Sequence, residues 1–238
     1  MKSRDRELIH FLDPADAIDG IVALGGPLTT TNLMRAYCRG IFPWPINDYI
    51  LPWCCPDERG ILEFNDLHIP RRLARIRQKS IFHFSIDRAF PQVITYCATV
   101  QRKHQASTWI TGPMIRAYCE LHRLGHAHSV EVWECTELAG RHSDLVGARS
   151  ELVGGLYGVD ACGTFAGESM FSLRSNASKL ALLFLIDYLK AHNLDWIDVQ
   201  MLTPHLEALG AKAISRADFL DKLTTTQKRK LTLFPPIA

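Results

Sequence analysis

The chain has 238 residues, of which 47% are hydrophobic and 22% charged, with a formal net charge of only +2. This composition fits a globular protein of one large or two small domains, and the low net charge excludes a globally basic nucleic-acid binder. No apolar run approaches the ~20 residues of a membrane helix, and the first residues lack the apolar core of a signal peptide. We therefore expect a cytoplasmic protein with no membrane partner.

Cysteine and histidine usage argues against metal chemistry. The seven cysteines are odd in number and contain no Cys-x-x-Cys pair, which argues against a disulfide framework and a structural zinc site. His122, His126 and His128 invite a metal hypothesis, but Gly125 separates the helix end from a strand on which His126 and His128 have no acid or cysteine within helical reach. Residues 20–26 resemble a phosphate loop, but no Gly-Lys-Ser/Thr follows them. We expect no metal and no cofactor.

Residues 1–60 are predicted to form a small N-terminal domain. Residues 29–39 have the polar start and apolar spacing of a short helix, which ends at Gly40. The proline-rich residues 42–45 must then be extended. A boundary near Gly60 is expected, because residues 61–64 are strand-like and begin a second domain, residues 61–238.

The second domain opens with a basic helix. On a helix over residues 71–79, Arg71, Arg72 and Arg75 fall on the side opposite Leu73 and Ile76. A charge run of this kind is usually a solvated face, and a phosphate-binding surface is the alternative.

Alternating strands and helices follow. Residues 82–86 and 126–137 read as strands, and residues 90–99 and 114–124 as helices. Residues 139–150 lie within a local repeat of the pattern acid-Leu-Ala/Val-Gly, which we interpret as a longer surface hairpin.

The richest stretch runs from residue 154 to residue 200. Strand-like residues 154–159 and 163–172 predict a hairpin, with Glu168 inside an otherwise apolar strand, where a lone acid is costly unless it is paired. A helix capped by Ser175 or Asn176 should follow. Residues 196–201 then form a strand.

Alternation in that strand predicts two faces. Trp196, Asp198 and Gln200 should share one face, and residues 197, 199 and 201 the other. Residues 204–209 and 216–223 are predicted helices, and residues 228–230 begin an exposed basic tail.

Six motifs in a fixed order carry a family resemblance over nearly the whole chain. They are residues 40–44, 108–111, 124–133, 167–172, 176–179 and 198–200. Together they resemble the leucyl/phenylalanyl-tRNA–protein transferase family of bacteria. The resemblance implies an α+β fold with a small N-terminal domain and an acetyltransferase-like (GNAT-type) C-terminal domain around a central mixed sheet.

The resemblance also implies an activity and its partners. The enzyme would move leucine, phenylalanine or methionine from charged tRNA to the α-amino group of proteins with N-terminal arginine or lysine, marking them for N-end-rule degradation. It would act as a monomer. Residues 139–150 and the stretch around Cys54, Cys55 and Glu58 depart from the family pattern.

Site residues follow from the same match, with packing or structural roles as alternatives for the aromatic residues and Glu168. Asp198 and Gln200 would be the catalytic pair, and Glu168 would pair with the basic N-terminal residue of the acceptor. Aromatic residues beside the substrate would be Trp44, Trp109 and Tyr118. An apolar aminoacyl pocket would consist of Leu156, Phe165, Met170 and Leu185. Phosphate contacts with tRNA would come from Arg71, Arg72, Arg75, Arg77 and Lys79.

The chemistry needs alignment more than nucleophilic catalysis, because a tRNA-linked ester is already activated. The Gln200 amide is too weak a base to take a proton. We therefore expect Gln200 to orient the acceptor's amine and Asp198 to hold the Gln200 amide in place. The pH dependence of the transfer rate should then show no titrating group of the enzyme. A proton relay through Asp198 is the alternative. Asp198→Ala should abolish transfer without unfolding the protein, because a polar residue on the site face contributes little to the core.

Two other classes compete with this interpretation. An acyl-CoA N-acetyltransferase of the same fold would need a glycine-rich loop for the pyrophosphate, and residues 173–179 lack glycine. A non-catalytic tRNA-binding module would need the arginines but neither Asp198 nor Gln200.

Overall fold

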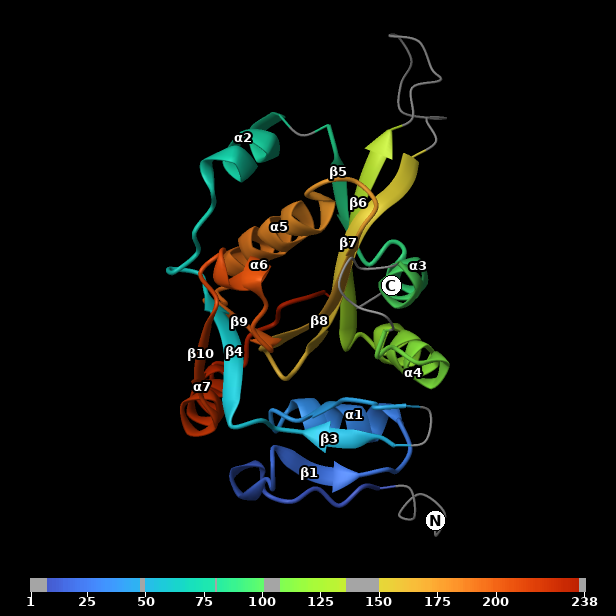
Figure 1. The fold of residues 1–238 in the computed structure, drawn as a ribbon, viewed down its shortest axis with the longest axis vertical. Helices are drawn as coiled ribbons and strands as arrows, with labels where there is room; N and C mark the ends of the chain where they lie inside the picture. Colours follow the sequence, from blue (N-terminus) through green and yellow to red (C-terminus); the bar gives the residue numbers. More distant parts are fainter. Residues whose placement is uncertain (1–7, 48–49, 80, 101–107, 136–149, 236–238) are drawn as a thin grey trace.

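The structure is a computed structural model that describes residues 8–47, 50–79, 81–100, 108–135 and 150–235. These residues form a small three-stranded sheet and a large seven-stranded sheet with helices on both faces, a mixed α+β architecture (Figure 1). No helix in this described part is long and apolar enough to cross a membrane.

The N-terminal part consists of the small sheet and one helix. Its antiparallel strands are β1 (Ile21–Leu24), β3 (Pro52–Cys54) and β2 (Phe42–Pro43), in that order. Helix α1 (Thr30–Tyr37) begins where predicted, because the Thr29 hydroxyl accepts a hydrogen bond from the Asn32 backbone N–H at 3.2 Å. The segment that resembles a phosphate loop forms strand β1 and the turn after it.

The large sheet has the strand order β10-β4-β9-β8-β7-β6-β5. Among the strand pairs that the structure describes, β8–β9 alone is parallel, which makes the sheet mixed. In chain order the strands are β4 (Glu58–Glu63), β5 (His83–Ile86), β6 (Ala127–Cys135), β7 (Ser150–Asp160), β8 (Phe165–Ser172), β9 (Trp196–Gln200) and β10 (Lys212–Ser215).

Helices cover both faces of the large sheet. In chain order they are α2 (Arg71–Lys79), α3 (Phe90–Thr99), α4 (Gly112–Arg123), α5 (Ala177–Ala191), α6 (Pro204–Glu207) and α7 (Arg216–Lys228). Figure 1 shows α5 and α6 on one side of the sheet and α3 and α4 on the other. Two neighbouring glycines of β7 allow close packing: a Cβ at Gly154 would collide with Ala177 of α5, and one at Gly155 would collide with the Val130 carbonyl oxygen of β6, 2.7 Å away.

The predicted hairpin, helix and strand at the centre of the chain are confirmed as β7, β8, α5 and β9. The cap position is confirmed at Asn176, but the expected side-chain cap is not formed. Asn176 precedes α5 in the left-handed region (φ 69°), and its side chain caps no helical N–H. Of the inserted residues 139–150, Ser150 begins β7, and the rest lie outside the described residues.

Two further expectations need correction. Cys38 and Cys162 form a disulfide that joins the end of α1 to the β7–β8 turn, a pair that 124 residues of sequence separation conceal. The C-terminal segment is not simply an exposed tail, because Leu233 and Phe234 are buried and the Phe234 ring stacks on His128. Apolar side chains near the chain end thus complete the core.

Candidate active site

A pocket of about 330 Å³ lies among β7, β8, β9, α5 and the segment after β9. Eight of the predicted site residues line it: Trp44, Trp109, Leu156, Phe165, Glu168, Met170, Leu185 and Gln200. The prediction missed several others, namely Tyr157, Gly167, Ser169, Leu182, Ile197, Val199, Met201, Thr203, His205 and Leu206.

One part of the pocket wall is aromatic. The indole rings of Trp44, which follows β2, and Trp109, which precedes α4, are stacked with centroids 5.2 Å apart and an interplanar angle of 18°. The two residues come from distant parts of the chain. Flat, partly buried faces of this kind can stack on another planar group.

The body of the pocket is apolar. Leu156 comes from β7, Phe165 and Met170 from β8, and Leu185 from α5. Ile197 and Val199 of β9 extend this wall, and their shared face follows from strand alternation. Such a wall binds by shape and burial of apolar surface.

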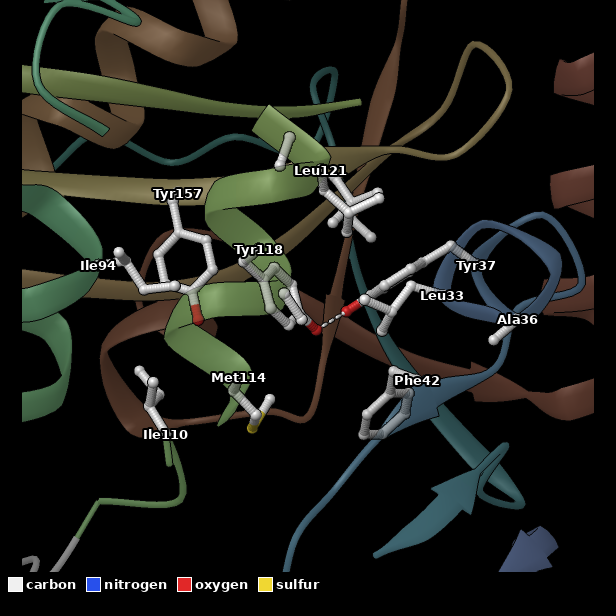
Figure 2. Close-up of a cluster of buried hydrophobic side chains, with 14 of the residues drawn as sticks. Leu33, Ala36, Tyr37, Phe42, Ile94, Ile110, Met114, Tyr118, Leu121 and Tyr157 are labelled. Carbon is white, nitrogen blue, oxygen red and sulfur yellow. Dashed lines mark hydrogen bonds between the residues drawn. The ribbon is translucent and has the colours of Figure 1, made fainter. Parts of the chain in front are cut away.

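Glu168 lies at the polar part of the wall and has three side chains within hydrogen-bond distance. Its Oε1 accepts from the Tyr37 hydroxyl at 2.7 Å and from Nε2 of Gln200 at 2.5 Å, and its Oε2 lies 3.3 Å from the Tyr118 hydroxyl. Figure 2 shows the hydroxyls of Tyr37 and Tyr118 pointing toward one another from α1 and α4. Because each hydroxyl has one hydrogen and Tyr37 donates to Glu168, the Tyr118 hydroxyl donates either to Tyr37 or to Glu168. Tyr118 therefore lies behind Glu168 and touches the pocket only through it.

Burial dominates the electrostatics of this cluster. Desolvation raises the pKa of Glu168 to about 7, opposed by the hydrogen bonds from Tyr37 and Gln200 and reinforced by the negative charge of Asp198. Desolvation and the Glu168 carboxylate also raise the pKa values of Tyr37 and Tyr118 well above their ordinary range. Both tyrosines are therefore hydrogen-bond donors at neutral pH.

Two β-bulges present the polar side chains. Between the pairs Tyr157–Ser169 and Gly158–Gly167, Glu168 is the extra residue of β8. Between the pairs Ile61–Asp198 and Gly60–Gln200, β9 also has one extra residue. A bulge changes where the following side chain points and is common beside active sites.

The β9 bulge corrects the predicted alternation. Gln200 has φ 61°, in the left-handed region. It lines the pocket with Ile197 and Val199 rather than sharing a face with Asp198. Only glycine fits opposite this bulge without strain, because a Cβ at Gly60 would lie 3.1 Å from the Met201 carbonyl carbon.

Asp198 is buried away from the pocket and paired with a residue that the sequence prediction missed. Its oxygens accept hydrogen bonds from Nε and Nη2 of Arg59 at 2.8 and 2.6 Å, and its Oδ1 also accepts from the Gln200 backbone N–H at 2.8 Å. The Asp198 residue is 5% exposed. The expectation that it contributes little to the core was therefore wrong.

Arg59 is 1% exposed and lies between the rings of Phe42 and Phe219, 4.5 and 4.6 Å from their centroids. Desolvation opposes its charge, but the Asp198 carboxylate more than offsets this and raises the guanidinium pKa above its ordinary value. A lone arginine beside Gly60 has no sequence signal that separates it from a surface residue. Its role depends on a partner 139 positions away.

The basic stripe on α2 is exposed, as its helical spacing predicted. Arg71, Arg72 and Arg75 are all exposed to solvent. Arg77 instead forms an ion pair with Asp187 of α5. Arg77 therefore also joins two helices.

The predicted histidine cluster does have an acid nearby. Asp87, which follows β5, accepts a hydrogen bond from His128 at 2.7 Å, and its other oxygen lies 3.7 Å from His122 Nδ1. Within the described part of the chain, no group of three or more His, Cys, Asp or Glu residues could hold a metal ion.

The pocket is apolar, and a carboxylate and an amide converge on one part of its wall. This arrangement is typical of an enzyme that holds an apolar group beside hydrogen-bonding side chains. Two family models match the chain. Residues 26–57 match the leucyl/phenylalanyl-tRNA protein transferase N-terminal domain, and residues 61–224 match leucyl/phenylalanyl-tRNA protein transferase.

Proteins named leucyl/phenylalanyl-tRNA–protein transferase are similar over most of their length. The Lawsonia intracellularis protein is 45% identical, covering 87% of this chain and 84% of its own. The Pseudoalteromonas atlantica protein is 41% identical over 94% and 90%, and the Hamiltonella defensa protein 40% identical over 97% and 94%. The chain belongs to the leucyl/phenylalanyl-tRNA–protein transferase family and is an aminoacyltransferase.

Proposed function

We propose that the protein moves leucine, phenylalanine or methionine from charged tRNA to the α-amino group of proteins that begin with arginine or lysine. This transfer would mark the acceptor for N-end-rule degradation. The pocket carries the proposal, because its apolar wall suits those side chains and its carboxylate and amide lie beside them. The protein would work as a monomer in the cytoplasm.

Each part of the pocket has a role in this proposal. Leu156, Phe165, Met170 and Leu185 hold the amino-acid side chain, and the stacked Trp44 and Trp109 receive the planar base at the end of the tRNA. The ester carbon would then lie between the apolar and polar parts of the wall.

The polar part of the wall receives the acceptor. Within the described residues the amide nitrogen of Gln200 is bonded to Glu168, and its amide oxygen accepts no hydrogen bond, so this oxygen is free to orient the amine. Asp198 holds the Gln200 backbone, and Tyr118 supports Glu168, which faces the basic N-terminal residue.

The division into residues 1–60 and 61–238, with an acetyltransferase-like second domain, belongs to the same proposal. The mixed sheet with its single parallel pair, β8–β9, supports it. The start of α5 does not favour coenzyme A, because Arg174, Ser175 and Asn176 stand where a pyrophosphate-binding loop needs glycines.

One assay separates this function from its competitors. Purified protein is offered radiolabelled leucyl-tRNA or acetyl-CoA together with a peptide that begins with arginine, and a peptide beginning with glycine is the control. We expect leucine on the arginine peptide only. Acetylation would indicate an acetyltransferase, and tRNA binding without transfer would indicate a binding module.

The same assay with isoleucyl-tRNA tests the pocket assignment. A β-branched side chain should clash near its Cβ, and discrimination worth roughly 1–3 kcal/mol predicts a slower rate rather than complete exclusion. Equal use of isoleucyl- and leucyl-tRNA would refute the assignment.

Arg71, Arg72, Arg75, Arg77 and Lys79 are proposed to contact tRNA phosphates. Replacing the exposed Arg71, Arg72 and Arg75 with glutamine should weaken the binding of all charged tRNAs alike. The slope of log binding constant against log salt concentration should become shallower by up to about 0.7–0.9 for each lost phosphate contact. Arg77→Gln is the matched single change and should alter the slope least, because Arg77 is already paired with Asp187. If the salt dependence of tRNA binding is unchanged in the triple variant, the three arginines are a solvated helix face and do not contact tRNA.

A further inference from the structure

Glu168 is the carboxylate that faces the pocket, and its hydrogen-bond partners are all neutral. Its contacts are two tyrosine hydroxyls and the Gln200 amide. We propose that Glu168 accepts the proton that the attacking α-amino group must lose, and that Tyr37 and Tyr118 position its carboxylate. This deepens and rests on the proposed transfer reaction: Glu168, which faces the basic N-terminal residue of the acceptor, also takes the proton of that residue's α-amine.

The geometry places Glu168 within reach of the amine. Nε2 of Gln200 lies 2.5 Å from Glu168 Oε1, so an amine bonded to the amide oxygen of Gln200 lies beside the same carboxylate. Among the described contacts, Glu168 Oε2 has only the Tyr118 hydroxyl within hydrogen-bond distance, at 3.3 Å.

Neither member of the proposed catalytic pair can take the proton as readily. The Asp198 carboxylate is held by Arg59 and the Gln200 backbone and does not line the pocket. An amide such as Gln200 is not a base at neutral pH. Asp198 is better described as the residue that holds Gln200 in its bulged conformation.

The step is balanced in atoms and electrons. The amine nitrogen forms a bond to the ester carbon while giving one proton to Glu168, and the bond between that carbon and the ribose oxygen breaks, its electron pair leaving with the oxygen. Glu168 then returns the proton to the ribose oxygen. The products are an amide and a ribose hydroxyl, and the carboxylate is regenerated.

The titration of Glu168 suits this role. With a pKa of about 7, a substantial fraction of Glu168 is ionised near neutral pH, where the carboxylate can accept a proton. The titratable and charged groups around it are Tyr37 of α1, Tyr118 of α4, Asp198 of β9 and Arg59 of β4. His205 also lines the pocket and is the competing base.

The test measures kcat/KM against pH, which reports groups of the free enzyme and the free acceptor. Two arginine-starting peptides with different α-amine pKa values are used with leucyl-tRNA, and spontaneous ester hydrolysis is subtracted. One inflection should follow the peptide. A second, near pH 7, should stay in place for both peptides because it belongs to the enzyme.

Glu168→Gln then identifies the group. Glutamine keeps the shape and can still accept from Tyr37 and Gln200, so we expect an unchanged fold, a kcat lowered by about 10²–10⁴-fold and loss of the enzyme inflection. Glu168→Asp should restore part of the rate together with the inflection. Melting curves of the same preparations check folding.

Two further variants keep the proposal falsifiable. Tyr37→Phe removes a donor that stabilises the charged carboxylate, so the inflection should move to higher pH. His205→Gln should leave the inflection near pH 7.

The opposing outcomes are distinct. If Glu168→Gln raises only the peptide KM, Glu168 binds the acceptor without taking its proton, and the inference is overturned while the proposed function stands. If the inflection near pH 7 disappears in the His205→Gln variant, His205 is the base, and the inference about Glu168 is overturned as well. Absence of leucine transfer by the wild-type protein contradicts the proposed function itself.

Discussion

Two carboxylates on neighbouring strands, the buried Asp198 of β9 and the half-buried Glu168 of β8, have opposite surroundings. On one side Asp198 is bonded through both oxygens to the buried guanidinium of Arg59. On the pocket side Glu168, from the neighbouring strand β8, has only uncharged donors. Because a full positive charge compensates one carboxylate and dipoles only partly stabilise the other, the first is a structural anchor and the second is free to change its protonation state.

The comparison shows why proximity to a site does not define a chemical role. Asp198 is only two residues from Gln200, and the motif that contains them reads as a catalytic pair. The bulge in β9 separates them, since it turns Gln200 into the pocket and leaves Asp198 facing Arg59. A reaction that needs a proton acceptor is better served by the carboxylate without a countercharge.

The largest effect should come from removing the anchor. Asp198→Ala leaves the Arg59 charge buried and unpaired, and breaking such a pair typically costs about 3–5 kcal/mol. We therefore expect a strongly lowered free energy of unfolding, measured by denaturant titration, together with loss of transfer.

The double variant Arg59→Met with Asp198→Leu is the matched control for this change. Replacing both charges with apolar residues should recover much of the stability, because no unpaired charge remains. Transfer should stay low, because the hydrogen bond to the Gln200 backbone is still missing. If Asp198→Ala unfolds at the wild-type denaturant concentration, the anchor role is refuted.

The second largest effect concerns how the stability of the folded protein depends on pH. The folded-state pKa of Glu168, about 7, lies above its ordinary 4.5, so between these values the folded protein holds a proton that the unfolded chain has released. Stability from this group is therefore complete below about pH 4.5 and is lost as the pH rises through 7.

The Glu168→Gln variant has no carboxyl group at this position, so it should not lose this stability as the pH rises. The stability of the variant relative to wild type should rise by up to roughly 3 kcal/mol between pH 4.5 and pH 8, measured by urea unfolding at a series of pH values. A constant difference across the range would mean that Glu168 is not buried as a neutral acid near neutrality.

The smallest expected effects concern the glycines beside the bulges. A Cβ at Gly158 would collide with the Ala166 carbonyl oxygen and the Phe165 ring, one at Gly60 would approach the Met201 backbone at 3.1 Å, and one at Gly167 would meet only the Asp198 carbonyl at 3.5 Å. Alanine should therefore destabilise the protein in the order 158, 60, 167, with about 1–3 kcal/mol for overpacked positions.

Thermal melting of the three alanine variants measures this order. Gly167→Ala is the control, since its new methyl group makes only ordinary contacts. Equal melting temperatures for all three variants would show that the backbone at the bulges can relax.

Much of the architecture could be predicted because its signals are local. Apolar spacing located α3 over Phe90–Thr99, and the change from strand to helical periodicity after Ser172 located α5. The site residues followed from the family match, and eight of them do meet in one pocket. The short strands β1 and β10 were not predicted, because four residues are too few to show a strand period.

The sequence by itself determined the family, the strand and helix periodicities and the chemical types available to the site. Tertiary structure alone decided how those groups are paired: Arg59 with Asp198, Tyr37 and Tyr118 with Glu168, and Cys38 with Cys162. The physical reason is that periodicity reports burial within one element, whereas a charge partner or a bulge depends on the register between strands far apart in the chain.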